Sequence, residues 1–135
     1  PESRLLIVGA GPLRADLQQQ IDDAGLGEAV FLTGAQRNPY ALLAASDCFV
    51  LSSLYEGQPM VLLEAAICEL PIVSTAFGSV YGALPDGAIR IVEQDDDALA
   101  AGMTAFLDGD VPAATLDVDA YRADVKAEFE ALLDG

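Results

Sequence analysis

The chain has 135 residues, of which 53% are hydrophobic, and 22 acidic against 6 basic side chains give it a formal net charge of −16. This length and composition predict one folded domain with a substantial core and exclude a disordered chain. The charge argues against nucleic acid and anionic membrane surfaces as partners.

The two cysteines, Cys48 and Cys68, both lie in apolar segments. We expect them to be small core side chains rather than a disulfide framework or zinc ligands. The longest apolar run is interrupted by Glu64 and then by Pro71, so we expect no transmembrane segment. No signal peptide is recognisable, and a reducing cytoplasm is the expected location.

Short apolar runs alternate with runs of helical periodicity along the whole chain. In chain order they predict a strand at 5–8, a helix at about 13–24, a strand at 30–32, a helix from Pro39 through Ala45, a strand at 48–51, a helix at 60–67, strands at 72–74 and 89–92, and helices at 95–107 and 118–133. The first and third strands are expected to be buried. The alternation predicts a doubly wound, parallel α/β sheet with right-handed crossovers. From the last helix we expect these side chains to pack inward: Tyr121, Val125, Phe129 and Leu132.

A glycine pair follows the first strand, where a dinucleotide-binding turn would stand. Gly9 and Gly11 match the start of that fingerprint, but Arg14 occupies the position of its third glycine. No acidic residue closes the second strand, so we set the dinucleotide interpretation aside. Gly11 remains a candidate ligand contact, although a tight strand-to-helix turn explains the pair equally well.

A polar loop, residues 33–38, follows the second strand at the edge of the sheet where ligands bind in such folds. Arg37 in this loop is one of only six cations in the chain, and it stands where a phosphate or a base could be reached. A solvated arginine is the alternative interpretation. Asn38 and Pro39 then have the composition of a helix start.

The chain is organised around the segment that follows the third strand. Glu56 lies in the loop after this strand, and Pro59 fits the first position of the next helix. From Met60 to Ile67 nearly every residue is apolar, so this helix is expected to be buried on all sides. Glu64, eight positions after Glu56, is its one charged residue, and burying a carboxylate is costly unless it is paired.

This segment, Glu56-Gly57-Gln58-Pro59-Met60-Val61-Leu62-Leu63-Glu64, resembles the E-x7-E motif of retaining, nucleotide-sugar-dependent glycosyltransferases of family 4. The resemblance extends to four flanking stretches, at residues 5–12, 30–34, 43–47 and 70–75. It implies one Rossmann-like half of a GT-B enzyme, whose active site lies in the cleft between two halves. It also implies that the chain is the C-terminal, donor-binding domain of a hexosyltransferase.

The resemblance assigns roles to the motif residues. Glu56 would be the catalytic residue, contacting hydroxyls of the donor sugar and stabilising positive charge at its anomeric carbon, and Glu64 would accept hydrogen bonds from the ribose. Backbone amides would meet sugar and phosphate at Gly57, Gln58, Met60 and Val61. No cofactor and no metal is implied, because the motif lacks adjacent aspartates. The alternatives are that Glu56 only favours a helix N-terminus and that Glu64 is a paired structural carboxylate.

Against the family pattern, parts of the enzyme are missing from this sequence. The family's domain opens with one more strand and helix, carrying an Arg and a Lys that grip the diphosphate, and its acceptor domain comes earlier still. We therefore expect a fragment that transfers no sugar alone, with a glycan or lipid-linked glycan acceptor bound by the absent N-terminal domain. The glycines and glutamate that many members carry near residues 77–82 are not present in that form, which leaves the donor open.

A fainter resemblance concerns residues 74–85 and the helix around Tyr121, which are similar to glycosyltransferase regions of bacterial teichoic-acid-type polymer synthases. It implies a role in cell-wall or surface polysaccharide. Two alternative functions stay open. One is a GT-B epimerase of nucleotide sugars, and the other is a non-catalytic, flavodoxin-like binding module.

Overall fold

The computed structural model describes residues 3–133, apart from the side chains of Glu128, Leu132 and Leu133. Strands and helices alternate as predicted, and every strand pairing is parallel. The chain divides into two compact units, residues 1–42 and residues 43–135, which are treated separately. In the described part of the chain, no helix has the length and apolar character that crossing a membrane requires.

The first unit is a strand–helix–strand element made of β1 (Leu5–Val8), α1 (Arg14–Asp23) and β2 (Val30–Gly34). The two strands pair from Leu5 opposite Val30, with a shift of register between Ile7 and Val8, and Thr33 Oγ1 donates a 3.4 Å hydrogen bond across them to the Ile7 carbonyl. Among the described residues of this unit, Ile21 is the one buried hydrophobic side chain.

The prediction that the first strand is buried is wrong. Its burial alternates along the strand, and Leu6 and Val8 are 40% and 44% exposed. Among the described elements of this unit, β1 has a single strand neighbour, β2, and α1 is the only helix beside the pair. A two-stranded sheet with one helix covers one face of its strands at most.

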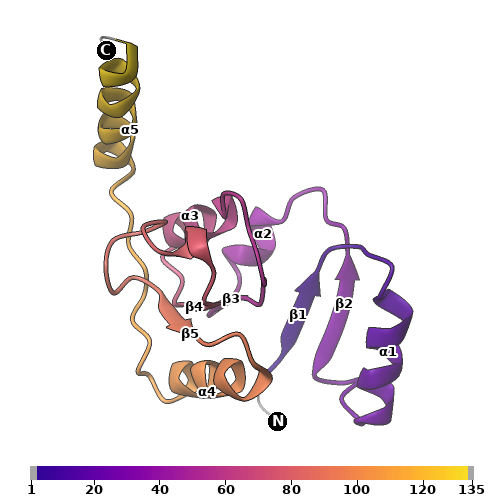
Figure 1. The fold of residues 1–135 in the computed structure, drawn as a ribbon. Coiled ribbons are helices and arrows are strands. Elements are labelled where there is room, and N and C mark those ends of the chain that lie inside the picture. Colours follow the sequence, from indigo (N-terminus) through magenta and orange to yellow (C-terminus); the bar gives the residue numbers. More distant parts are fainter. Residues whose placement is uncertain (1–2, 134–135) are drawn as a thin grey trace. The chain divides into compact units, whose positions relative to one another are not determined.

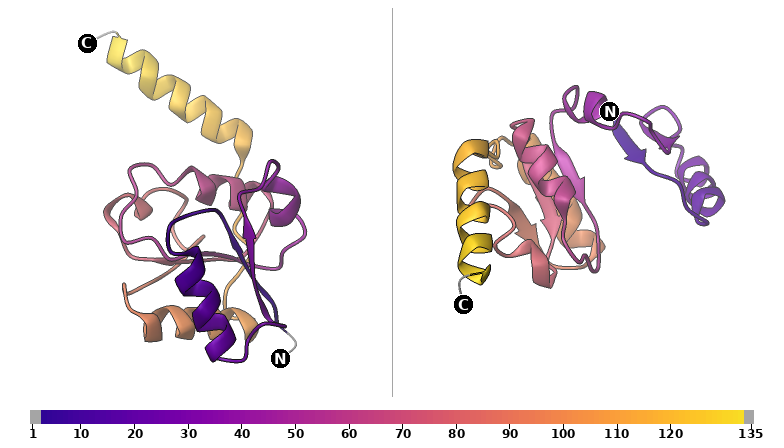
Figure 2. Two further views of the ribbon diagram at one scale, coloured as in Figure 1. Left: turned by 90° about the vertical axis from the view of Figure 1, so that its right-hand side faces the viewer. Right: turned by 90° about the horizontal axis from the view of Figure 1, so that it is seen from above.

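The second unit contains a three-stranded parallel sheet between helices. The sheet order is β3 (Phe49–Leu51), β4 (Ile72–Thr75), β5 (Arg90–Val92). Helices α3 (Met60–Ile67) and α4 (Asp96–Leu107) lie on opposite faces of this sheet (Figures 1 and 2). A short helix, α2 (Tyr40–Leu43), stands at the unit boundary, a 3₁₀ turn, η1 (Gly78–Val80), follows β4, and α5 (Val118–Leu133) comes last.

The core of the molecule lies in this second unit, around β4. All four β4 residues are buried because β4 has strands on both sides and a helix on each face. Gly102 lets α4 approach closely, since a Cβ atom there would lie 2.8 Å from Val73 Cγ1 and 3.0 Å from Val92 Cγ1. The side chains of the buried cluster come from α3, β4 and the loops around them: Leu62, Leu63, Ala65, Ala66, Leu70, Ile72, Phe77, Val80, Leu84 and Ala114.

The outer strand and the motif helix are less buried than predicted. β3 is half-buried throughout, because among the described strands it pairs with β4 alone. Helix α3 is buried on one side only, and Met60 and Ile67 are 50% and 56% exposed. A helix that covers one face of a sheet keeps its other side toward solvent.

Helix α4 begins at Asp96, one residue after its predicted start, because Asp95 is the N-cap and its side chain accepts a 2.8 Å hydrogen bond from the Ala98 N–H. The predicted packing of α5 holds only for its first turn. Tyr121 is half-buried against the core cluster, whereas Val125 and Phe129 are 47% and 61% exposed. The side chain of Leu132 lies outside the described residues.

The segment between α4 and α5 is tied to the sheet. The Ala114 N–H donates to the Leu70 carbonyl at 3.1 Å, and residues 71 and 113 form an antiparallel bridge. Val111 and Ala114 are buried. These contacts hold the segment between α4 and α5 against the second unit, and so place the start of α5 near α3.

Candidate functional site

The motif loop, residues 52–59, leaves the carboxyl end of β3, and Glu56 is held at both its side chain and its main chain. Ser53 Oγ donates to Glu56 Oε1 at 2.7 Å, and Ser79 Oγ donates to the Glu56 carbonyl at 2.7 Å. Glu56 is half-buried as a result. Its carboxylate is therefore positioned before any ligand arrives, which reduces the ordering entropy that binding would cost.

Further side chains fasten the loop to its neighbours. Thr75 Oγ1, at the end of β4, donates to the Ser53 carbonyl at 2.6 Å and to the Leu51 carbonyl at 3.3 Å. Gln94 Nε2, just after β5, donates to the carbonyls of Leu54 at 2.8 Å and Ala76 at 2.5 Å. The segments that leave all three strands are thus joined at the carboxyl edge of the sheet.

Sequence reasoning missed these anchoring residues: Ser53, Thr75, Ser79 and Gln94. Their positions could have indicated them. Three of these residues end a parallel strand or follow one within a few residues, and the carboxyl ends of parallel strands meet at one edge of a sheet. The sequence around each residue does not predict which carbonyl its side chain contacts.

Helix α3 begins beside this loop. Pro59 is buried and stands one position before the helix, at its N-cap, so the prediction that it fills the first helical position is wrong by one residue. Among the described residues no side chain caps α3. In its first turn the Met60 and Leu62 N–H groups donate to the Gln58 and Pro59 carbonyls at 2.9 Å and 3.0 Å, so this end offers a ligand mainly the positive end of the helix dipole.

Glu64 lies on the more exposed side of α3. It is half-buried, and Met60 and Ile67, one turn away in either direction, are exposed. The expectation of a carboxylate within a fully apolar helix is thus corrected, because Glu64 borders the open side of α3 rather than the core.

The other predicted contacts lie in the first unit. Gly11 follows β1 and Arg37 follows β2, and both residues are exposed. The strands are parallel, so both residues belong to the carboxyl edge of that pair. Glu56 and Glu64 belong to the second unit.

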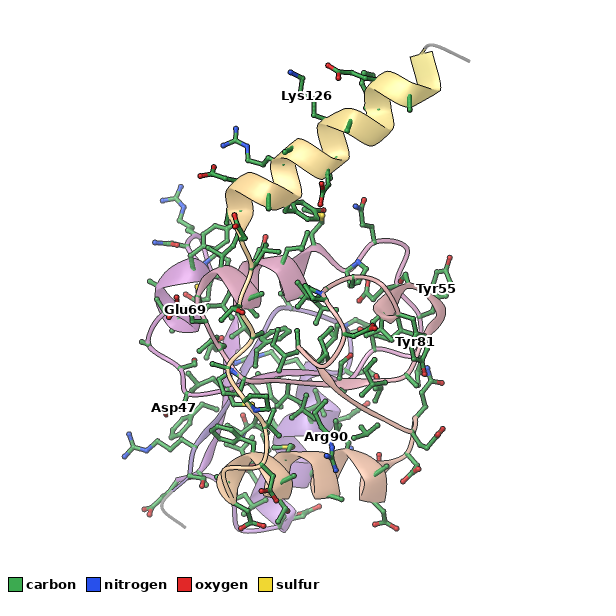
Figure 3. All side chains as sticks on the ribbon, turned by 90° about the vertical axis from the view of Figure 1, so that its left-hand side faces the viewer. Asp47, Tyr55, Glu69, Tyr81, Arg90 and Lys126 are labelled. Carbon is green, nitrogen blue, oxygen red and sulfur yellow. The ribbon has the colours of Figure 1, made fainter. Side chains whose placement is uncertain are left out.

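Two hollows open on the second unit. The one next to the motif loop has a volume of about 300 Å³, and its lining residues are Gly57, Gln58, Pro59, Leu63, Ser79, Tyr81, Gly82, Ala83 and Tyr121. A larger hollow of about 520 Å³ lies between β5 and the first half of α4. Tyr81 lines both hollows, and it points outward on the same side of the unit as Tyr55 (Figure 3).

Cys48 and Cys68 are free and half-buried, so they lie at the border of the core rather than inside it as predicted. Burial, with a smaller contribution from the Asp47 carboxylate, raises the pKa of the Cys48 thiol to about 11. Its Sγ donates to its neighbour's carbonyl, that of Phe49, at 3.6 Å. Within residues 3–133 no group of three or more His, Cys, Asp or Glu side chains is placed to hold a metal ion.

With this geometry in view, comparison with known proteins decides the family. Residues 1–109 match the family of glycosyl transferases group 1. The chain belongs to this family. The match ends at residue 109, before α5, the helix that contains Tyr121.

Among curated relatives, an uncharacterized glycosyltransferase of Methanocaldococcus jannaschii is 44% identical over 75 residues, which are 56% of this chain and 18% of that protein. The gpi3 subunit of a Schizosaccharomyces pombe phosphatidylinositol N-acetylglucosaminyltransferase is 33% identical over 80% of this chain and 25% of that protein. This glycosyltransferase domain therefore spans a quarter or less of these relatives.

Among solved structures, HepE of Anabaena in complex with UDP has a TM-score of 0.71 at 23% identity, over 84% of this chain and 34% of that one. The likeness confirms the predicted fold class, a Rossmann-like α/β half of the GT-B type.

Proposed function

We propose that this chain is the C-terminal, nucleotide-sugar-binding domain of a retaining hexosyltransferase of family 4. The observation that carries the proposal is the anchored motif loop, which fixes Glu56 at the carboxyl edge of the sheet beside the uncapped start of α3. This is the edge at which open parallel sheets bind their ligands. A UDP complex of the similar HepE supports a uridine nucleotide as one ligand class.

In the proposed reaction, the bond between the anomeric carbon and the diphosphate oxygen breaks, and an acceptor oxygen bonds to the same carbon on the same face. The departing phosphate takes the acceptor proton, so no protein base and no metal is needed. The first turn of α3 binds the diphosphate, with backbone contacts at Gly57, Gln58, Met60 and Val61. Glu56 stabilises positive charge developing on the sugar.

Three further residues are assigned to the nucleotide. Glu64, on the open side of α3, accepts hydrogen bonds from the ribose hydroxyls. Gly11 and Arg37, at the carboxyl edge of the first unit, contact the donor through backbone and guanidinium groups. These assignments rest on the motif and on the edge that each residue occupies.

The proposed enzyme contains further segments besides residues 1–135. Each of the two sheets has outer strands with one hydrogen-bonded neighbour among the described strands, so each sheet has edges of N–H and C=O groups that a further strand can pair. We assign that strand, its helix with the cationic diphosphate grip, and an N-terminal acceptor domain to the rest of the protein. Relatives in polysaccharide synthesis, such as the Salmonella typhi Vi polysaccharide protein, support a glycan or lipid-linked glycan acceptor. Cytoplasmic location stays a prediction.

The test compares two substitutions in the full-length protein. Glu64→Gln removes a charged hydrogen bond to a part of the donor that does not react, so KM for the donor should rise by roughly 10- to 100-fold with kcat little changed. Glu56→Gln acts where charge develops, so kcat should fall by roughly 100-fold or more. Glu28→Gln, on the exposed surface of the first unit, is the matched control.

Thermal melts must show that all three variants fold. Full kcat in a folded Glu56→Gln variant would contradict the proposed role of the motif. The isolated chain of residues 1–135 should transfer no sugar, and turnover by it alone would contradict the assignment of an acceptor domain to the rest of the protein.

A further inference from the structure

The hollow of about 300 Å³ next to the motif loop is lined by two parts of the chain. Gly57, Gln58 and Pro59 belong to the motif itself. The opposite wall comes from Tyr81, in the loop after β4, and from Tyr121, in α5. Tyr81 lies within the residues matched by the family, and Tyr121 lies after residue 109, where the match ends.

The chemistry of the lining selects a neutral ligand with polar edges and apolar faces. Of the described residues that line the hollow, none carries a charge, so a phosphate would find no cation there. Hydrogen-bonding groups are present on Gln58, Ser79 and the two tyrosines, whereas Pro59 and Leu63 are apolar. A hexose ring has this character, with hydroxyls around its edge and C–H groups on its faces.

The size of the hollow agrees with a single ring. Pockets for small molecules range from about 300 to 1,000 Å³, and this one lies at the lower end, too small for a whole nucleotide sugar. Two of its lining residues are also held in place. Ser79 is bonded to the Glu56 carbonyl, and Tyr121 packs against the buried cluster.

We propose that this hollow binds a hexose ring, and that Tyr81 and Tyr121 are the side chains that determine which hexose fits. The inference rests on the proposed function, because it places the ring next to Glu56. Ser79, which lines the hollow, donates a hydrogen bond to the Glu56 carbonyl. The ring belongs either to the donor or to the acceptor, and the two sources are separated by the ligands used in the test.

The experiment measures binding to the full-length protein by calorimetry. Donor probes are UDP-glucose, UDP-N-acetylglucosamine and GDP-mannose, each against its own nucleoside diphosphate. Methyl α-D-glucopyranoside and methyl α-D-mannopyranoside, added with saturating UDP or GDP, probe an acceptor ring. The variants are Tyr81→Leu and Tyr121→Leu, with Tyr121→Phe to keep the packing and Tyr40→Leu, in the first unit, as the control.

If the ring is the donor's, Tyr81→Leu and Tyr121→Leu should weaken sugar nucleotides by roughly three- to tenfold relative to the bare diphosphates. If it is the acceptor's, the same variants should weaken only the methyl glycosides. Either result supports the proposal, provided that Tyr40→Leu changes neither. Unchanged binding in both leucine variants, or equal weakening of sugar nucleotides and bare diphosphates, would overturn it.

Tyr121→Leu could unfold the start of α5, so Tyr81→Leu, whose side chain is 65% exposed, decides the matter if the melts differ. Glu64→Gln serves as the separate check on the proposed function. If it weakens UDP or GDP while the tyrosine variants change nothing, the donor site stands and only the hexose inference fails. If it changes no ligand's binding, the proposed function itself fails.

Discussion

The two units of the chain begin alike and end up differently buried. Each contains apolar parallel strands, and each uses a threonine at the carboxyl edge to bond a neighbouring segment, Thr33 to Ile7 and Thr75 to Ser53. Yet β4 is buried along its whole length, whereas Leu6 and Val8 of β1 are 40% and 44% exposed. Apolar sequence makes a strand available for burial, and the number of strands and helices around it decides whether burial occurs.

A leucine-to-alanine pair should show this difference most strongly. Leu62, on α3, is 0% exposed, so Leu62→Ala should lower the free energy of unfolding by about 2–5 kcal/mol. Leu6→Ala removes the same atoms from a partly exposed site and should cost about 1 kcal/mol or less. Urea unfolding followed by circular dichroism measures both. Equal losses would show that Leu6 is covered in solution.

A glycine-to-alanine pair should give the next largest effect. In α4 the new methyl of Gly102→Ala would lie 2.8 Å from Val73 Cγ1, and this overpacking, of about 1–3 kcal/mol, should outweigh a helix-propensity gain of about 1 kcal/mol. Gly27→Ala, in the first unit, meets nothing within 4 Å and should change stability by about 0.5 kcal/mol at most. The same unfolding curves give both values, and a stabilised Gly102→Ala variant would mean that α4 moves away from the sheet freely.

Substitutions of Thr75 and Thr33 compare the hydrogen bonds at the carboxyl edges of the two sheets. Thr75→Val keeps the shape but removes the donor to the Ser53 carbonyl, bonded at 2.6 Å, and should cost about 1 kcal/mol. It should also loosen the motif loop, which hydrogen exchange at residues 52–56 would detect. Thr33→Val loses a longer bond of 3.4 Å and should cost about 0.5 kcal/mol or less. Unchanged exchange in Thr75→Val would contradict the anchoring role of this hydroxyl.

The smallest effect on stability at neutral pH is expected in the outer strand of the second unit. Burial raises the pKa of the Cys48 thiol to about 11, so its neutral form is favoured in the folded chain. The contribution of this thiol to the free energy of unfolding is therefore fully present below pH 9.0, the ordinary pKa of a cysteine. It is lost as the pH rises from there through about 11.

Because little thiolate forms at pH 8, iodoacetamide should alkylate Cys48 roughly 100-fold more slowly than free cysteine. Peptide mass spectrometry measures the rate, and urea should restore it. Equal rates in folded and unfolded chains would mean that β3 is less covered than the structure shows.

The sequence by itself determined the elements and the motif. The helices at 60–67 and 118–133 lie where helical spacing predicts them, and the strands differ from prediction by two residues or fewer. Glu56 and Glu64 fall on the loop and helix that their spacing indicated. These features depend on neighbours along the chain, so local pattern is enough to find them.

Only the tertiary structure decided burial and the anchoring of the site. Ser53 and Glu56 are close in sequence, but Ser79 and Gln94 reach the motif loop from 23 and 40 residues away. Tyr121 lines its hollow from α5, far along the chain from the motif loop, while Phe129 on the same helix stays exposed. Hydrogen bonds and packing between distant segments depend on which elements meet in space, and no local pattern contains that information.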